Sequence, residues 1–499
     1  MFSQLINNKI IRNTSLFIIL TEALSFLGYY YQIINSIAFF AIAILVLVLS
    51  LYRLEYGLFI LLTELLIGSF GYLFYFETGG FKISIRIALW LIIMSVWLAK
   101  EIIKIIKTKK IELDFFRSSY LFYFLALFIF IVFGMINGFL KNNSLNNIFF
   151  DSNNWFYFSL IFPIFSVLKN DDNIKIVKQI FLTSIGWLSI KTIILAYIFS
   201  HSFNFFALDL YLWVRRSGVG EITQVVPGFN RIFMQSHIFI LIGFFILLFY
   251  LLKNLKEKSI ALNKQNFSLI IFSALLLSVI IISFSRSFWL GLVAGAIFIY
   301  LIAIFKIKIG LKKFVIFNLI SVSIIILSLA LTLIIVKFPY PAPAGEFDAT
   351  NLFSERATQI AGEAGVSSRW QLLPELWQKI KTAPVLGQGF GATVTYKSND
   401  PRVLATNYGG EYTTYAFEWG WLDIWLKIGI LGLLAYLILF TKIIFDGLKI
   451  NSFFSFSLAT GLILILAVNM FSPYANHPLG IGYLIIAAIM IEKLKTPLR

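Results

Sequence analysis

The chain has 499 residues, of which 59% are hydrophobic and only 13% charged, and its mean hydropathy is +0.88. This composition excludes an ordinary soluble domain and predicts a membrane protein. The absence of cysteine excludes disulfides and thiolate chemistry, and the three histidines lie far apart in sequence, so no metal cofactor is expected. The net charge of +17 is explained by lysines that anchor cytoplasmic loops, so we expect no nucleic-acid partner.

Apolar windows of about twenty residues predict roughly fourteen transmembrane helices in one all-α polytopic protein. The stretch 14–30 leads directly into another apolar run without a small-residue cleavage site, so no cleaved signal peptide is expected. The predicted spans are 14–31, 36–52, 56–76, 83–103, 119–139, 154–168, 180–200, 232–252, 267–284, 287–305, 314–336, 419–443, 453–471 and 479–492.

Basic links between the spans predict the orientation. The links at 100–117, 253–264 and 306–313 are rich in lysine, which is typical of cytoplasmic loops. The alternation of spans then places both termini in the cytoplasm and the segments 201–231 and 337–418 outside. Both outer segments are too long to be turns.

The outer segment 337–418 replaces the apolar background with proline, glycine and acidic residues, which predicts a folded cap between helices in 1–336 and helices in 419–499. Within it, Ser367 and Ser368 precede apolar residues at the spacing of one helix face, up to Ile380. This pattern predicts a capped amphipathic helix on the membrane face, with Pro374 kinking it or delaying its start.

The arginines are distributed against the usual inside preference for positive charge. Only Arg12, Arg53, Arg117 and Arg499 fall on the predicted cytoplasmic side. Those at outer positions are Arg86, Arg215, Arg216, Arg231, Arg286, Arg356, Arg369 and Arg402. The guanidinium fork suits a phosphate or diphosphate, which favours a lipid-linked diphosphate as ligand.

Two alternatives exist for any one of these arginines. It can pair with an outer acid, Asp348, Glu355, Glu363 or Glu411, or it can reach lipid phosphates. Arg286 interrupts an apolar stretch, where a charge is costly, so a functional role is favoured there.

Three motifs in the order and placement seen here resemble the O-antigen ligase and O-antigen polymerase superfamily of bacterial surface-polysaccharide assembly. The first is Ser-Arg-Ser-Phe-Trp-Leu-Gly-Leu at 285–292, at an outer helix end. The second is the arginine-led helix 368–377 followed by Pro-Val-Leu-Gly-Gln-Gly-Phe-Gly at 384–391. The third is 418–432, where the outer loop enters the next helix.

The third motif departs from the ligase pattern at one position. Ligases of this family usually start it with His-Asn, eleven residues before the first glycine of a Gly-x-x-Gly. Counting back from Gly429 gives Glu418, so glutamate stands where histidine is expected. This difference favours a polymerase over a ligase.

The resemblance implies a GT-C-like multi-pass enzyme of the bacterial cytoplasmic membrane. It implies metal-independent, inverting transfer of glycan repeats from undecaprenyl diphosphate at the outer face, to another lipid-linked repeat in a polymerase or to lipid A core or protein in a ligase. The implied partners are the polyprenyl-diphosphate oligosaccharide, a glycan or lipid acceptor, membrane lipids, a chain-length regulator and a flippase.

Such a site needs a base for the acceptor hydroxyl and cations for the leaving diphosphate. Glu418 is the first candidate base, partly desolvated by Trp419, Trp421 and Trp425, and its alternative is a helix N-terminal carboxylate without further role. Other candidate bases are Asp423, Glu411 and His477. The candidate diphosphate ligands are Arg286 and Arg369, followed by Arg215 and Arg216. The glycines of 384–391 are expected to form a tight turn, not a phosphate cradle.

Two other classes of protein compete with this interpretation. A flippase or exporter would also bind a lipid diphosphate, but no acidic relay stands out within the spans. A glycosyltransferase with a carboxylate pair in its first outer loop is disfavoured because residues 29–35 contain no acid. Asp171 and Asp172, the only paired aspartates, fall in a predicted cytoplasmic turn, which disfavours a nucleotide-sugar enzyme.

Overall fold

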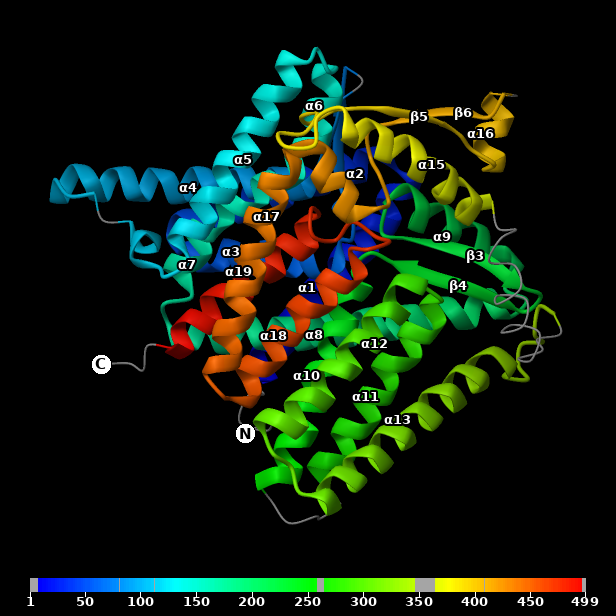
Figure 1. Cartoon of the computed structure of the whole chain (residues 1–499). Helices are drawn as coiled ribbons and strands as arrows, with labels where there is room; N and C mark the ends of the chain where they lie inside the picture. Colours follow the sequence, from blue (N-terminus) through cyan, green and yellow to red (C-terminus); the bar gives the residue numbers. More distant parts are fainter. Residues whose placement is uncertain are drawn as a thin grey trace.

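The computed structural model describes residues 8–79, 81–111, 113–257, 264–345, 364–407 and 409–495. It confirms an all-α polytopic membrane protein, in which helices pack into one bundle (Figure 1). The described residues also form three small β-hairpins. The helices of the first part are α1 (Asn8–Tyr30), α2 (Gln32–Tyr52), α3 (Leu54–Ile67), α4 (Ile85–Thr108), α5 (Leu121–Leu140), α6 (Leu145–Ser152), α7 (Ile161–Val167), α8 (Asp171–Ser200) and α9 (Asn204–Arg216).

The helices of the second part are α10 (His237–Glu257), α11 (Lys264–Ser283), α12 (Arg286–Leu301), α13 (Leu311–Lys337), α15 (Ala364–Lys381), α16 (Pro401–Thr406), α17 (Gly420–Lys449), α18 (Phe453–Val468) and α19 (Pro478–Lys495). The antiparallel hairpins are β1 (Tyr75–Thr78) with β2 (Phe81–Ser84), β3 (Gly220–Val226) with β4 (Phe229–Met234), and β5 (Val394–Lys397) with β6 (Glu411–Thr414).

Nine helices among the described residues are long and apolar enough to cross a membrane. The number of fourteen transmembrane helices stays a prediction. Three of the predicted spans differ from the structure. The span 56–76 ends at Ile67, after which the chain turns into β1; 232–252 begins as strand β4; and 154–168 consists of a 3₁₀ helix followed by the short α7. An apolar run shows burial, but hydropathy alone does not distinguish a strand from a helix.

Polar contacts join helix ends that the sequence assigns to the cytoplasmic side. Lys493 Nζ lies 2.5 Å from the Asp171 carboxylate, and the Ser118 hydroxyl donates to Glu492 at 2.5 Å. Lys313 Nζ donates to the carbonyl of Lys256 at 2.8 Å. These contacts hold the helix ends together, and the orientation of the spans stays a prediction.

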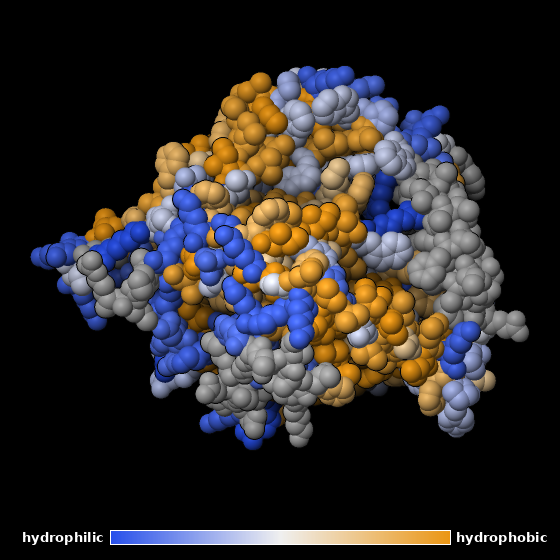
Figure 2. Space-filling model, turned by 60° about the horizontal axis from the view of Figure 1, so that its bottom comes forward, coloured by the Kyte–Doolittle hydropathy of each residue, from blue (hydrophilic) through white to orange (hydrophobic). Residues whose placement is uncertain are grey.

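The bundle is apolar both inside and on much of its flank. Figure 2 shows apolar side chains over a broad part of one face, with polar side chains concentrated to one side of it. Helix α10 is buried on nearly all sides, as expected of an all-round apolar helix in the centre of a bundle. The exposed apolar flank suits contact with lipid.

Buried ion pairs lock the N-terminal helices together. Arg86 binds both carboxylate oxygens of Glu64 at 3.0 Å and donates to the carbonyl of Ser69 at 2.5 Å. Lys191 pairs with Glu22 at 2.8 Å. Arg86 therefore pairs with a carboxylate, although Glu64 is not among the acids predicted as partners of the outer arginines.

The described part of the cap packs on the start of α17, and Figure 1 shows α15, β5 and β6 beside the upper end of that helix. The apolar face of α15, formed by Leu372, Leu376 and Ile380, is buried against Phe417 and Leu426. The amphipathic helix is confirmed, and its predicted placement on the membrane face stays a prediction. Its apolar face packs on protein, and the cap thereby fixes the entrance to α17.

The predicted serine cap of this helix is wrong, because the helix already runs from Ala364 and Ser368 lies inside it. Pro374 also lies inside the helix, so it does not delay the start, and the kink stays a prediction. The Ser368 hydroxyl lies 3.0 Å from that of Ser398, and the backbone N–H of Asn399 donates to it at 3.0 Å. Ser368 therefore binds the segment that follows β5 instead of capping the helix. The predicted acidic partners Asp348, Glu355 and Glu363, with Arg356, lie outside the described residues.

Candidate functional site

A polar cavity of about 1250 Å³ lies between the cap, the β3–β4 hairpin, the start of α17 and the turn between α18 and α19. Among the described residues, the acidic, basic and histidine side chains in its wall are Asp151, Glu221, Arg231, Arg369, Asp400, Glu418, Asp423, Lys427 and His477. Carboxylates and cations from segments far apart in sequence therefore share one chamber that is large enough for sugar units.

Glu418 and Arg369 form an ion pair in the cavity wall. The Trp419 indole N–H donates to the backbone carbonyl of Arg369 at 3.0 Å, which fixes the cap helix to the end of the outer loop. The side chains of Glu418 and Arg369 are 52% and 38% exposed. The structure thus brings together the first candidate base and one candidate diphosphate ligand.

The desolvation of Glu418 by its neighbouring tryptophans is not observed. The Trp421 and Trp425 indoles donate to the carbonyls of Leu466 and Pro384, at 3.3 and 2.8 Å. Their rings therefore bind other segments and leave the Glu418 side chain half exposed. A helix start projects successive side chains in different directions, which composition alone does not reveal.

A buried network of charges forms the floor of the cavity. Lys427 Nζ contacts the carboxylate of Asp151 and lies 2.6 Å from Asp423 Oδ1. The Asn476 amide donates to Asp423 Oδ2 at 2.5 Å, and the Gly391 N–H donates to Asp151 Oδ2 at 2.9 Å. Burial raises the pKa of the Asp151 carboxyl, while Lys427 and the Gly391 N–H oppose that shift.

Sequence reasoning named Asp423 and missed Asp151 and Lys427. A signal for Lys427 exists, because Asp423 and Lys427 are four residues apart within an apolar helix, where charges are costly and usually paired. Asp151 follows a short polar stretch and has no such signal. Its role in the network depends on packing between α6 and α17.

The glycine turn at 384–391 crosses α17 next to this network. Gly387, Gly389 and Gly391 have φ angles of 77°, 80° and 77°, which favour glycine. The N–H groups of Gln388 and Gly389 donate to the carbonyls of Leu426 and Lys427, at 2.6 and 3.1 Å. The prediction of a tight turn is confirmed, because these N–H groups bind α17.

Helix α17 is broken where it meets this turn. Gly429 has a φ of 71°, and a Cβ there would lie 2.1 Å from the carbonyl oxygen of Val385. A Cβ on Gly389 would lie 2.1 Å from the backbone nitrogen of Gly138 in α5. The glycine spacing therefore allows three backbones to approach closely beside the cavity.

His477 lies in the cavity wall, in the turn before α19. Its Nδ1 accepts the N–H of Leu479 at 3.3 Å, and its ring meets Phe70 edge-on at 5.7 Å. Burial, with Arg86 adding to it, lowers the pKa of His477 to about 3. The ring is therefore neutral near pH 7 with its proton on Nε2, which suits a hydrogen-bond donor better than a base.

The remaining candidate diphosphate ligands, Arg215, Arg216 and Arg286, do not line the cavity. Arg215 donates to the Tyr211 hydroxyl at 2.8 Å, and the guanidinium of Arg216 lies 5.4 Å from the Tyr29 ring centroid; both are exposed at the end of α9. Arg286 begins α12 near the cavity. The hydroxyl of the next residue, Ser287, accepts from Ser472 at 3.0 Å, beside a wall residue of the turn before α19.

Two further side chains lie elsewhere than their predicted roles suggest: one joins the cavity wall and the other lies outside it. Arg231 of β4 lines the cavity and donates from Nε to the carbonyl of Ser283 at 3.0 Å. Glu411, a rival base, is exposed on β6 opposite Lys397 and is not among the wall residues. In the described parts of the chain, no three His, Asp or Glu side chains cluster to hold a metal ion.

Residues 271–437 match the family model described as O-antigen ligase. No curated protein matches the chain. The matched region contains the cap, the glycine turn and the start of α17, and with them Arg369, Glu418, Asp423 and Lys427. This match supports assignment of the region to the O-antigen ligase and polymerase superfamily, whose members are membrane glycosyltransferase-like enzymes.

Proposed function

We propose that the cavity transfers a glycan from a polyprenyl diphosphate to an acceptor hydroxyl at the outer face of the bacterial cytoplasmic membrane. The observation that supports this most is the pairing of Glu418 with Arg369 in a cavity large enough for several sugars. The hydroxyl oxygen bonds to the anomeric carbon as the bond from that carbon to the diphosphate oxygen breaks. Inversion follows from this single displacement.

Glu418 is the proposed base. Its Oε2 contacts Arg369, and its half-exposed side chain offers the other oxygen to an acceptor hydroxyl. Asp423 is less suited, because Lys427 and Asn476 already occupy its two oxygens and the side chain is only 2% exposed. We assign Asp423 a positioning role at the cavity floor.

Arginines supply the cations for the diphosphate. Arg369 and Arg231 line the cavity from two different elements, the cap and the β3–β4 hairpin. Arg286 stands next to the cavity at the start of α12, where the helix N-terminus also favours an anion. Charge that develops on the leaving diphosphate would be stabilised by these groups.

The test is a transfer assay with purified protein in vesicles that contain a lipid-linked repeat unit. We expect lengthening of the glycan on its lipid, the result for a polymerase, because glutamate replaces the histidine of ligases. Transfer only to added lipid A core or protein would indicate a ligase. Movement across the bilayer with unchanged glycan length and linkage would indicate a flippase and overturn the proposal.

Orientation belongs to the same proposal, with both termini in the cytoplasm and 337–418 as the catalytic cap. Cysteines introduced near residue 100 and in the cap provide the test, since the natural chain has none. A membrane-impermeant thiol reagent applied from outside should label only the cap cysteine. Labelling only near residue 100 would place the cavity on the cytoplasmic side and contradict the proposal.

A further inference from the structure

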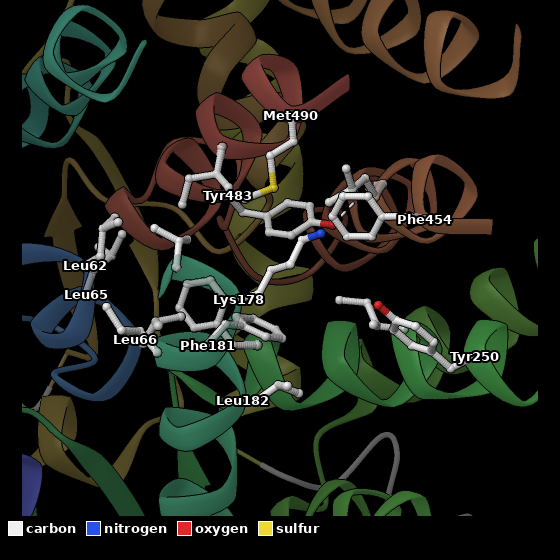
Figure 3. A pocket seen from close by; sticks show the side chains of 16 residues that line it. Leu62, Leu65, Leu66, Lys178, Phe181, Leu182, Tyr250, Phe454, Tyr483 and Met490 are labelled. Carbon is white, nitrogen blue, oxygen red and sulfur yellow. Dashed lines mark hydrogen bonds between the residues drawn. The ribbon is translucent and has the colours of Figure 1, made fainter. Parts of the chain in front are cut away.

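A second cavity lies within the helix bundle, between α3, α8, α10, α18 and α19 (Figure 3). Its free volume is about 90 Å³, which corresponds to roughly six or more water-sized spheres. Apart from two tyrosines and Lys178, its wall is made of apolar side chains. A glycan would find neither enough room nor enough hydrogen-bonding partners there.

The cavity is long and narrow. Its wall on α10 extends from Phe239 to Tyr250, about 17 Å along the helix axis at 1.5 Å per residue. The same cavity touches α19 from Tyr483 to Met490. A small volume spread over such a length fits one extended hydrocarbon chain.

One cation is placed at one end of this apolar slot. Figure 3 shows the Lys178 side chain turned into the cavity, and its Nζ lies 3.7 Å from the centroid of the Phe454 ring. Phe454 is the second residue of α18. Lys178 lies seven residues, or about 10 Å, from the start of α8 at the predicted cytoplasmic side. The amine therefore lies near the cytoplasmic edge of the hydrocarbon region.

The neighbouring acids are already engaged by other lysines. Asp171 pairs with Lys493 at 2.5 Å, and Asp172 pairs with Lys175 at 2.7 Å. Within the described residues, no carboxylate lines the cavity. A cation at the end of an apolar slot in a membrane favours an anionic partner, and lysine is a common ligand of phosphate.

We propose that this cavity binds one acyl chain of an anionic phospholipid from the cytoplasmic leaflet, with the lipid phosphate on the Lys178 ammonium. The chain lies between α10 and α19, and the head group lies at the Phe454 end. The site is separate from the transfer cavity and does not depend on the proposed reaction.

Lipid retention by the purified protein tests this site. The protein is delipidated, mixed with phosphatidylglycerol or phosphatidylcholine of the same acyl chains, and the bound lipid is counted by native mass spectrometry. We expect wild type to retain phosphatidylglycerol about fivefold better, the effect of one lysine near an anionic lipid. Lys178→Met should remove this preference.

Lys175→Met is the matched control, because Lys175 is on the same helix but is exposed and paired with Asp172. It should keep the preference for phosphatidylglycerol. Equal retention of the two lipids by wild type, or an unchanged preference in Lys178→Met, would overturn the proposal.

A second measurement does not depend on the folding of the Lys178 variant. A benzophenone amino acid in place of Tyr250 should crosslink to a lipid in native membranes, and the mass of the adduct identifies it. A phosphatidylglycerol adduct supports the proposal. A polyprenyl phosphate adduct, or none, contradicts it.

Discussion

Replacing Glu418 by glutamine tests the proposed base. The Glu418→Gln side chain keeps its size and its oxygen for Arg369, but it no longer accepts a proton at useful pH. General base catalysis contributes about 100- to 10,000-fold, so turnover should fall by about two to four orders of magnitude. This corresponds to about 3–5 kcal/mol in the activation free energy.

The structure predicts that this loss is not an effect on folding. The side chains of Glu418 and Arg369 are 52% and 38% exposed, and exposed ion pairs contribute about 1 kcal/mol or less. The thermal unfolding midpoint and the affinity for the lipid-linked donor should therefore stay close to wild type. Initial transfer rates, donor binding and thermal unfolding measured on one preparation separate the three quantities.

Rescue and control variants sharpen this test. Glu418→His should recover part of the lost turnover, and its pH profile should rise nearer to the imidazole pKa of about 6.5. Glu411→Gln, an exposed glutamate outside the cavity wall, should leave turnover unchanged. Near-normal turnover in Glu418→Gln with loss in Asp423→Asn would refute the assignment, and a folded variant that no longer binds donor would indicate a binding role.

Four further outcomes are expected. Arg286→Lys should fold but lose most of its activity, because lysine keeps the charge without the bidentate fork; wild-type polymer levels from this variant would exclude a diphosphate contact. Turnover should survive EDTA, and loss restored by a divalent ion would indicate a different mechanism. Gly389→Ala should abolish stable expression, because its Cβ would lie 2.1 Å from the backbone of α5. Gly310→Ala should express normally, because no atom lies within 4 Å of the added Cβ. Equal expression of the two variants would contradict the role of the glycine turn. Burial lowers the pKa of His477 to about 3, so the stability that neutral His477 contributes is present above the unfolded pKa of about 6.5 and is lost as the pH falls towards 3, by up to about 1.4 kcal/mol per pH unit. Between pH 7 and 5, His477→Gln should therefore lose less stability than wild type, as measured by chemical denaturation. Parallel stability curves of the two proteins would contradict this.

Hydropathy patterning predicted the membrane class and the position of most helices, because lipid and water sort side chains by polarity along the chain. The three motifs located the region that matches the family model. The apolar residues of β4 were predicted to be buried, which is correct, but to be helical, which is wrong. Their backbone N–H and C=O groups are hydrogen-bonded by pairing with β3 instead of within a helix.

The composition of the site depended on contacts between distant segments. Arg369 was predicted as a diphosphate ligand and Glu418 as a base, but their pairing required α15 to pack on α17. Arg86 carried the same sequence signal as the other outer arginines, yet Glu64 neutralises it inside the bundle. The sequence does not say which carboxylate a given arginine meets.

The sequence by itself determined which residues are too polar for lipid and on which side of the membrane they were expected. Only the tertiary structure decided that Asp151, 276 residues from Lys427, shares a buried network with it, and that Lys178 faces an apolar cavity. The physical reason is that the cost of burying a charge is a property of one residue, whereas its compensation depends on the partner that packing brings within a few ångströms.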